Sequence, residues 1–456
     1  MEWTGDWSDS SPLWTEQMQQ EIERVVKSDD GTFWMSFQDM LANFYSINVC
    51  MIRNPKYNKE PWIESRRKFY MDYDASDYDD TYDDDDRLSV PIFALTVSQP
   101  GGGHFIAAVH QEDIRCQGAK PYIDIGVSVL KVDPTYGTVS LVIGSGTSVE
   151  RQNQTEQFDL PPGKYLVVPT TTGIKLKQQM QQQQQSSSSG DTDTGSTTTT
   201  IGGQQQQRPP PKQLVIRGSD GKAVRFTDAA EEVFSELFDR MDYDGDGLLN
   251  KAELDQFMVR TEGAPIQDKA YQWLLDHFEA PQAKGLSKRG FILAQLFVFE
   301  RVGADEESLF SEFKALGYND QLELSHGRSA VLSVHGSVGF SLDVLPFDPE
   351  VFEAALELPI VEHGEVTQYE DGKVCLYRHR GGYGGVSFVV ANNHSQPLLF
   401  VMDCSGSKNV ISHRPNLKHE ELVPAGGRHV MHHLAPADVS AGSWSWRYAA
   451  SYMFSP

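Results

Sequence analysis

The sequence predicts a multidomain α+β protein, and three observations lead to this prediction. Short apolar runs separated by Gly and Pro turns recur within residues 50–177, with the spacing of a β-sandwich. Residues 226–303 instead carry apolar positions at helical intervals on both sides of an acidic loop. Residues 325–456 return to strand-like runs. At 456 residues the chain has the length of about three domains.

Composition limits the classes of function. The net charge of −25 argues against a general nucleic-acid binder and suits a protein that handles divalent cations. The four cysteines follow no CxxC spacing, which favours a reducing, cytoplasmic setting over a disulfide framework. The N-terminus shows no apolar signal segment, and no apolar run approaches the ~20 residues that span a bilayer. We therefore expect membrane contact to be peripheral at most.

Residues 1–49 begin with the stretch EWTGDWSDSSPLW, followed by a helix expected at 15–27 and then by DGTFWMSFQDM. Three tryptophans within the first fourteen residues need a core that 49 residues are too few to supply. In this order, the two blocks resemble the end of the catalytic domain of calpains, the calcium-dependent cysteine proteases. The resemblance implies that 1–49 is the tail of a truncated catalytic domain.

In that family the catalytic Cys, His and Asn all precede the first block. We therefore expect no catalytic residue in this chain, and whether it is an enzyme stays open, since a thiolate needs an imidazole within reach. Cys50 lies in a strand-like apolar run and is expected in a core. Cys404 lies near several histidines but shows no nucleophile signature, which disfavours a separate catalytic site there.

The same resemblance implies a second calcium site in the tail. Its ligands would be Glu2, Asp9, the Ser28 carbonyl and Asp30, and Thr32 stands where the family has a carboxylate. Losing that carboxylate removes an oxygen pair and weakens calcium binding. The alternative is that Glu2 and Asp9 are solvated.

Residues 50–177 are predicted to form the β-sandwich, with strands at 92–97, 105–109, 123–132, 139–143 and 165–168. Their closing segment, LPPGKYLVVP, resembles the β-sandwich domain that follows the calpain protease core. An acidic loop at 72–86 holds nine aspartates in fifteen residues. Such a run is usually a solvated loop, and the alternative is an electrostatic switch relieved by calcium or a basic surface.

Residues 178–212 are rich in Gln, Ser and Thr and cannot bury apolar surface, so we expect disorder there. This segment can be an insertion in the sandwich, in which case residues 213–225 supply a last sandwich strand.

The acidic loop at 242–253 has the spacing of an EF-hand calcium loop. EF-hands place oxygen ligands at loop positions one, three, five, seven, nine and twelve, with glycine at six. These positions hold Asp242, Asp244, Asp246, the Leu248 carbonyl, Asn250 and Glu253, and position six is Gly247. Apolar positions on both flanks continue as helices, which favours calcium binding over an acidic turn that binds nothing.

EF-hand loops usually occur in pairs, and a partner loop is expected at 279–290. Aligning Leu286 with Leu249 at position eight puts Glu279, Pro281, Ala283 and Gly290 at ligand positions. This set cannot coordinate calcium, so the sequence predicts a degenerate partner that braces the first loop, and one Ca²⁺ per chain.

Residues 304–324 are predicted to form a connecting helix over 305–317, and 325–456 a β-rich C-terminal domain. The segments GGYGGVSFVVANNH, MDCSGSKNVISHR and VPAGGRHVMHHL resemble the C-terminal domain of the small-optic-lobes type of calpain. The resemblance implies a regulatory or partner-binding module. The histidines of this region lack metal-site spacing, which favours a structural role for His413, His419, His429, His432 and His433.

Two functions follow. The chain is predicted to be the calcium-binding regulatory portion of a calpain-like cysteine endopeptidase, inactive by itself, whose partners are protein substrates, other proteins or the missing protease core. The alternative is a stand-alone, non-catalytic calcium-sensing adaptor.

Overall fold

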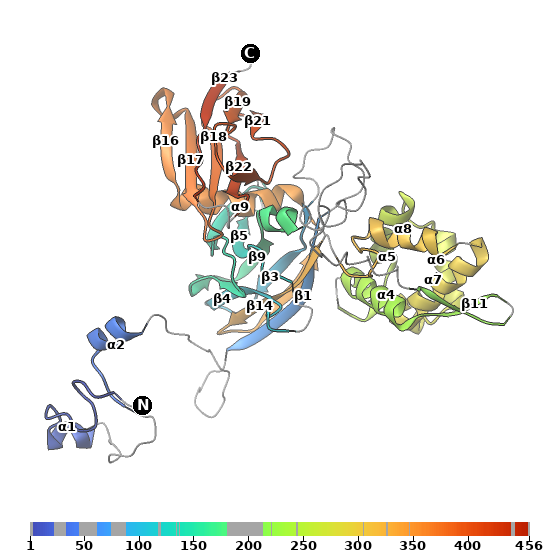
Figure 1. Cartoon of the computed structure of the whole chain (residues 1–456), viewed down its shortest axis with the longest axis horizontal. Coiled ribbons are helices and arrows are strands. Elements are labelled where there is room, and N and C mark those ends of the chain that lie inside the picture. The colour runs from blue at the N-terminus through green and yellow to red at the C-terminus, as the bar shows by residue number, and fades with distance from the viewer. Residues whose placement is uncertain are drawn as a thin grey trace, which may run out of the picture. The chain divides into compact units, whose positions relative to one another are not determined.

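The structure is a computed structural model, and it describes residues 3–21, 33–44, 62–73, 88–116, 120–133, 135, 137–179, 213–219, 221–242, 245–303, 305–324, 327–345, 347–438 and 443–454. The chain divides into two units, residues 1–61 and 62–456, which are described separately (Figure 1). None of the described helices is long and apolar enough to cross a membrane.

The first unit contains two short helices, α1 (Glu16–Glu21) and α2 (Phe37–Asn43). Ser36 caps α2, accepting a hydrogen bond from the Asp39 N–H at 3.0 Å. Trp14 joins the two blocks of this unit, since its ring meets Trp7 at 5.0 Å and Trp34 at 5.9 Å, both edge to face. The rest of the helix predicted at 15–27 lies outside the described residues.

The sandwich is built from two antiparallel sheets. One has the order β2-β1-β14-β4-β7, with β8 also on β4, formed by Leu88–Ser89, Ile63–Tyr73, Gly327–Gly336, Gly103–Gln111, Gln152–Gln154 and Phe158–Leu160. The other has the order β15-β3-β9-β5-β6, formed by Phe340–Leu345, Ile92–Val97, Gly163–Thr170, Gly126–Val132 and Val139–Gly144. The strands predicted at 92–97, 105–109, 139–143 and 165–168 fall within these elements, whereas the strand predicted at 123–132 begins only at Gly126. Apolar side chains from both sheets, including Phe69, Phe93 and Phe105, form one buried core.

Two sandwich strands come from a part of the chain that the sequence assigned elsewhere. Strand β14 pairs with β1 from Gly336 opposite Ile63 to Gly327 opposite Asp72, and β15 pairs with β3. Figure 1 shows β14 beside β1. The prediction that the C-terminal domain begins at 325 is therefore wrong. The apolar residues of β14 show that the strand is largely buried. They do not show which sheet it joins, because that depends on a partner strand far away in the sequence.

A helical unit at 213–324 is thus inserted between sandwich strands β9 and β14. It contains α4 (Asp228–Met241), α5 (Lys251–Glu262), α6 (Asp268–His277), α7 (Lys288–Val302) and α8 (Glu306–Ala315). Thr227 caps α4, and the face formed by Phe234, Leu237 and Phe238 is buried in the core of this unit.

Strand β10 (Val215–Arg217) pairs with β11 (Ala223–Phe226), not with the sandwich. The predicted last sandwich strand at 213–225 is therefore wrong. Leu214 and Val215 bury their side chains in the helical core instead, and the Leu214 N–H donates to Glu306 on α8 at 2.9 Å. Apart from Asp72 and Tyr73 the acidic segment lies outside the described residues, and so do residues 180–212.

The C-terminal domain follows helix α9 (Pro349–His363), which sequence analysis did not predict. Its sheets have the orders β16-β17-β18-β22-β20 and β21-β19-β23, formed by Glu365–Tyr369, Val374–Arg380, Val386–Asn392, Arg428–Pro436 and Val410–Ser412, and by Lys418–Val423, Leu398–Asp403 and Ala449–Phe454. The apolar side of α9 packs on both the sandwich core and the C-terminal sheet through Phe352, Ala355 and Ile360.

Candidate functional site

The loop at 242–253, called loop one, begins where α4 ends and closes where α5 begins. The Asp242 N–H donates to the Phe238 carbonyl at 2.9 Å, so the first predicted ligand is also the C-cap of α4. Gly245 and Gly247 have φ values of +70° and +79°, a backbone conformation that glycine adopts without strain. The glycine predicted at position six therefore makes the turn that the loop requires.

The carboxylates of loop one are directed into the loop by its own backbone. Asp242 Oδ2 accepts from the Gly247 N–H at 3.0 Å, and Asp246 Oδ1 accepts from the Leu248 N–H at 2.8 Å. Because a carboxylate oxygen has further lone pairs, these bonds orient the groups without consuming their capacity to bind a cation. The predicted ligand Asp244 lies outside the described residues.

Glu253 is held by a capping box at the start of α5. Asn250 accepts from the Glu253 N–H at 3.2 Å, and Glu253 Oε2 accepts from the Asn250 N–H at 2.9 Å. Glu253 is buried, so its carboxylate lies at the inner side of the loop. A cation coordinated by both Glu253 oxygens would share Oε2 with this hydrogen bond. Ligand binding therefore acts directly on the first turn of α5.

The second loop, residues 279–290 and called loop two, pairs with loop one. Strand β12 (Leu248–Leu249) is antiparallel to β13 (Leu286–Ser287), with Leu249 opposite Leu286 and both side chains fully buried. The predicted alignment of these two leucines is confirmed. The Tyr271 hydroxyl donates to the Leu249 carbonyl at 3.3 Å, which ties α6 to the same ladder.

Loop two is closed by its own backbone. A Cβ at Gly290 would lie 2.3 Å from the Glu279 carbonyl oxygen, so position twelve of this loop is packed against position one. A short 3-10 turn at Pro281–Ala283 occupies the middle, where Gln282 and Ala283 both have φ of +56°. A side chain at position twelve would therefore collide with the backbone at position one, and the ligand positions also lack the oxygen donors that calcium needs. The sequence alone predicted that loop two lacks calcium ligands, but the backbone contact at Gly290 is visible only in the fold.

The second predicted calcium site is not assembled by the described residues. Glu2, Ser28 and Asp30 lie outside them, and Asp9 lies in the turn between the tryptophans of the first unit. The proposed ligand set thus stays a prediction.

The C-terminal histidines meet in a cluster that sequence spacing did not reveal. His419 and Glu421 project from the same side of β21 toward His429 on β22, and their ligand atoms lie within 4.8 Å of one another. We call these three residues the His/Glu cluster. A metal site could be built from such donors, but Arg414 is buried beside them and its Nη2 lies 2.6 Å from His429 Nε2.

The guanidinium of Arg414 occupies the ring nitrogen of His429 that a metal ion would need. A guanidinium only donates, so His429 Nε2 accepts and its proton lies on Nδ1, which is 2.8 Å from Glu353 Oε1. Arg414 also donates to the Val430 and Met431 carbonyls at 2.8 and 3.0 Å. The lone pair that a metal would need is therefore used, and the cluster is stabilised by a cation of the chain itself.

The thiols of this domain do not form a nucleophilic site. Cys375 and Cys404 are buried, and burial raises the pKa of Cys404 to about 12, with Asp403 adding to the effect. Burial also lowers the pKa of His432 to about 3. A buried, neutral thiol does not supply the thiolate that cysteine catalysis requires.

Comparison with known protein families finds matches at the two ends of the chain. Residues 1–51 match a family described as calpain family cysteine protease, and residues 360–456 match one described as calpain-D-like, C-terminal domain. Both ends of the chain are thus similar to parts of calpains. The calpain-type cysteine protease DEK1 of Zea mays is 40% identical over 79 residues, covering 17% of this chain and 4% of that protein.

Two further relatives align with longer parts of the chain. Calpain-5 of Mus musculus is 28% identical over 190 residues, covering 37% of this chain and 29% of that protein. EF-hand calcium-binding domain-containing protein 7 of Xenopus laevis is 24% identical over 301 residues, covering 64% of this chain and 43% of that protein. The chain thus spans less than half the length of each of these relatives.

Proposed function

We propose that the helical unit is an EF-hand pair that binds one Ca²⁺ in loop one, and that the chain is the calcium-binding regulatory portion of a calpain-like protein. The observation that carries this proposal is the Leu249–Leu286 ladder, which joins a loop of oxygen donors to a loop closed on itself. Asp242, Asp246, the Leu248 carbonyl, Asn250 and Glu253 would hold the ion, together with Asp244. Calcium would supply the charge that joins the start of α5 to the end of α4.

The regulatory part of the proposal is supported by the position of the helical unit within the sandwich. Both ends of the unit lead into sandwich strands, so a change at loop one acts on a calpain-type module and not on a free tail. The proposed partners are a protease core and protein substrates, in a cytoplasmic setting that keeps thiols such as Cys404 reduced. We propose that the C-terminal domain is of the kind found in calpains of the small-optic-lobes type.

A stand-alone calcium-sensing adaptor is the second candidate. The helical unit carries an apolar groove of about 670 Å³ between α5, α6, α7 and α8, lined by residues such as Met258, Trp273 and Val298. A groove of this kind can take an apolar segment of a partner protein.

The experiment that tests calcium binding is isothermal titration of the full chain with CaCl₂. One site per chain with a Kd of about 10⁻⁷–10⁻⁵ M supports a sensor. A chain that binds no calcium refutes the proposal. Adding the chain to a calpain-type protease core, with and without calcium, then separates a regulator, which changes proteolysis, from an adaptor, which does not.

A further inference from the structure

A cavity of about 360 Å³ lies between the sandwich and α4, and none of its lining residues belongs to the proposed calcium site. Arg328 at the start of β14 and Lys120 in the segment before β5 face it from the sandwich, and Glu232 and Glu236 face it from α4. Glu232 is exposed, so the cavity opens to solvent. Its volume falls in the range of about 300–1,000 Å³ that is typical of small-molecule sites. We call it the Arg328 cavity.

Arg328 is a buried cation without a counter-ion in the described part of the chain. It is 9% exposed, its Nη1 donates to the Gly327 carbonyl at 2.8 Å and its Nη2 donates to Gln179, so both partners are neutral. Its Nε is buried and has no hydrogen-bond partner among the described residues. Burial lowers the pKa of Arg328 to about 10, which leaves it charged at neutral pH. A buried charge of this kind is stabilised when an anion pairs with it.

Lys120 brings a second cation to the same cavity. Its side chain is half-buried and forms no hydrogen bond or ion pair with any residue that the structure describes. Burial, and then Arg328, lowers the pKa of Lys120 to about 8, so the two cations are close enough to repel each other. One anionic group bound beside both would relieve this repulsion and accept hydrogen bonds from both.

The wall around the two cations is acidic. It contains Glu112, Glu232, Glu236 and Glu323, and none of these carboxylates forms an ion pair within the described ranges. Three of them, Glu323, Glu236 and Glu112, act on Lys120 in the sense that raises its pKa. Because four carboxylates outnumber two cations, the wall would repel a simple anion. A ligand that carries both a carboxylate and an ammonium group matches both parts of the cavity.

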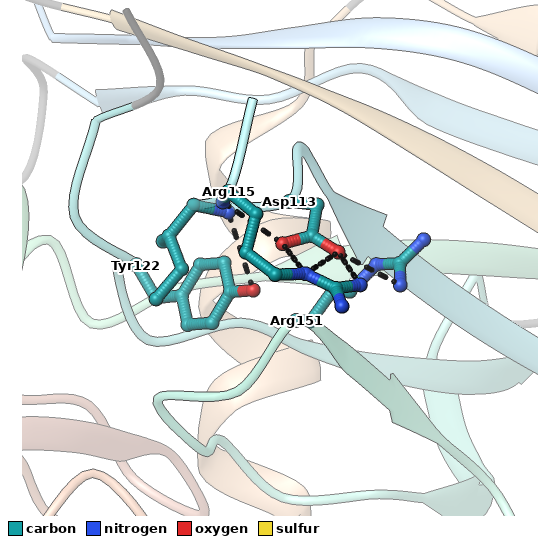
Figure 2. A network of polar contacts seen from close by, with 5 residues as sticks. Asp113, Arg115, Tyr122 and Arg151 are labelled. Atoms are coloured by element: carbon teal, nitrogen blue, oxygen red, sulfur yellow. Dashed lines mark hydrogen bonds and ion pairs between the residues drawn. The ribbon is translucent and has the colours of Figure 1, made fainter. Parts of the chain in front are cut away.

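The part of the cavity wall between β4 and β5 is held at its base. The Gln111 side chain donates to the Ile123 carbonyl at 2.8 Å and accepts from the Ile123 N–H at 3.0 Å. Figure 2 shows the Asp113 carboxylate between Arg115 and Arg151, at 2.5 Å from Arg115 Nη2 and 3.2 Å from Arg151 Nη1. The hydrogen bonds from Arg115 hold the pKa of Asp113 well below its usual range, so this contact stays charged. The sandwich side of the cavity is therefore pre-formed.

We propose that the Arg328 cavity binds a small α-amino acid, with its carboxylate on Arg328 and Lys120 and its ammonium group among the glutamates of the wall. The buried side chains of Val233, Leu322 and Leu324 supply an apolar surface for an aliphatic side chain. The bound molecule would join the sandwich to α4, because the cations belong to the sandwich and two of the glutamates to α4. The site shares no residue with loop one, so it does not depend on calcium.

The test is titration calorimetry of the full chain with L-alanine, L-valine and L-leucine, in the presence of a calcium chelator. Isovalerate, which is valine without the ammonium group, and isobutylamine, which is valine without the carboxylate, are the matched probes. We expect one amino-acid site per chain with a Kd of about 1 mM or tighter, and binding weaker by about tenfold or more for isovalerate and isobutylamine.

Substitutions then locate the ligand. Lys120→Met should raise the Kd of the tightest amino acid about fivefold and Arg328→Met about tenfold or more, since each change removes a charged donor. Lys164→Met, at an exposed lysine on β9, is the matched control and should leave the Kd unchanged. Glu236→Gln should weaken amino-acid binding and strengthen isovalerate binding, because it removes a carboxylate that attracts the ammonium group and repels an anion.

The Lys120→Met chain keeps the test decisive where Arg328→Met fails to fold, because Lys120 has no hydrogen bond to lose among the described residues. A chain that binds none of the three amino acids overturns the proposal, and so does binding that neither Lys120→Met nor Glu236→Gln alters. Isovalerate that binds as tightly as valine would reveal a simple anion site and would overturn it too. Since these titrations contain no free calcium, each result is independent of whether loop one binds the ion.

Discussion

Loop one and the His/Glu cluster both bring carboxylates and other metal-type ligands together, but different groups orient these ligands. In loop one the carboxylates accept hydrogen bonds from backbone amides, which carry no net charge. In the His/Glu cluster the buried guanidinium of Arg414 already supplies the positive charge. The comparison teaches that donor type alone does not define a metal site, because a side-chain cation can fill the same geometry.

The largest expected effect is on loop one, where we propose that calcium binds. Replacing Glu253 by Gln, or Asp242 by Ala, should raise the calcium Kd about 100-fold or more, because each change removes a charged ligand from a site of few ligands. Titration calorimetry measures this. Glu279→Gln, the matched change in loop two, should leave calcium binding unaltered, and a loss of binding there would show that loop two takes part.

The second-largest expected effect tests whether the Arg414 guanidinium stabilises the His/Glu cluster. Arg414→Met leaves two buried carbonyls and the His429 nitrogen without their donor, so the free energy of unfolding should fall by about 3 kcal/mol or more. Chemical denaturation followed by tryptophan fluorescence measures the loss. Arg380→Met, on an exposed strand end, is the control and should change stability by less than about 0.5 kcal/mol.

Sequence reasoning found loop one because its chemistry is local. Six ligand positions and a glycine lie within twelve consecutive residues, so the spacing alone predicts the geometry. The leucine at position eight also predicted the pairing of the two loops, since an apolar residue between ligand positions needs a buried partner.

The features that sequence missed depend on contacts between distant segments. Strand β14 joins β1 across more than 250 residues of chain, and nothing in its own pattern states which sheet it completes. Arg414, in the segment between β20 and β21, meets His429 on β22, and Arg240 of the helical unit meets Tyr70 of the sandwich. Neither pair has a sequence spacing to recognise. One local signal was overlooked: Asp348 followed by Pro349 is a helix start, and it begins α9.

The third effect uses pH to separate the two regions. Glu357 lies on α9 near the His/Glu cluster, and burial, with Glu353 adding to it, raises the pKa of Glu357 from 4.5 to about 8. Between these values the folded chain binds the proton and the unfolded chain does not, so stability falls as pH rises from about 4.5 to 8 and then levels off.

In the Glu357→Gln chain the side chain at position 357 is neutral at every pH, so this decline in stability with rising pH should disappear. The full pKa shift of Glu357 corresponds to a gain in the free energy of unfolding of at most about 5 kcal/mol for the variant. Water that hydrates the ionised Glu357 carboxylate of the wild type lowers the gain expected at pH 9 to on the order of 2 kcal/mol. Denaturation at pH 5, 7 and 9 measures it, with the exposed Glu420→Gln as the control. A variant whose stability declines with pH as the wild type does would place the titrating group elsewhere.

The smallest effect asks whether loop two can be made to resemble loop one. Gly290→Glu restores a carboxylate at position twelve, but its Cβ would lie 2.3 Å from the Glu279 carbonyl oxygen, so the backbone must move. We expect a stability loss of about 1–3 kcal/mol and a calcium stoichiometry that stays at one. Arg289→Glu introduces the same carboxylate at the exposed neighbouring position and should cost less. A second bound calcium in the Gly290→Glu chain would mean that loop two lacks only a ligand. An unchanged stoichiometry, with the loss confined to Gly290→Glu, would mean that backbone closure keeps the cation out, as Arg414 does in the His/Glu cluster.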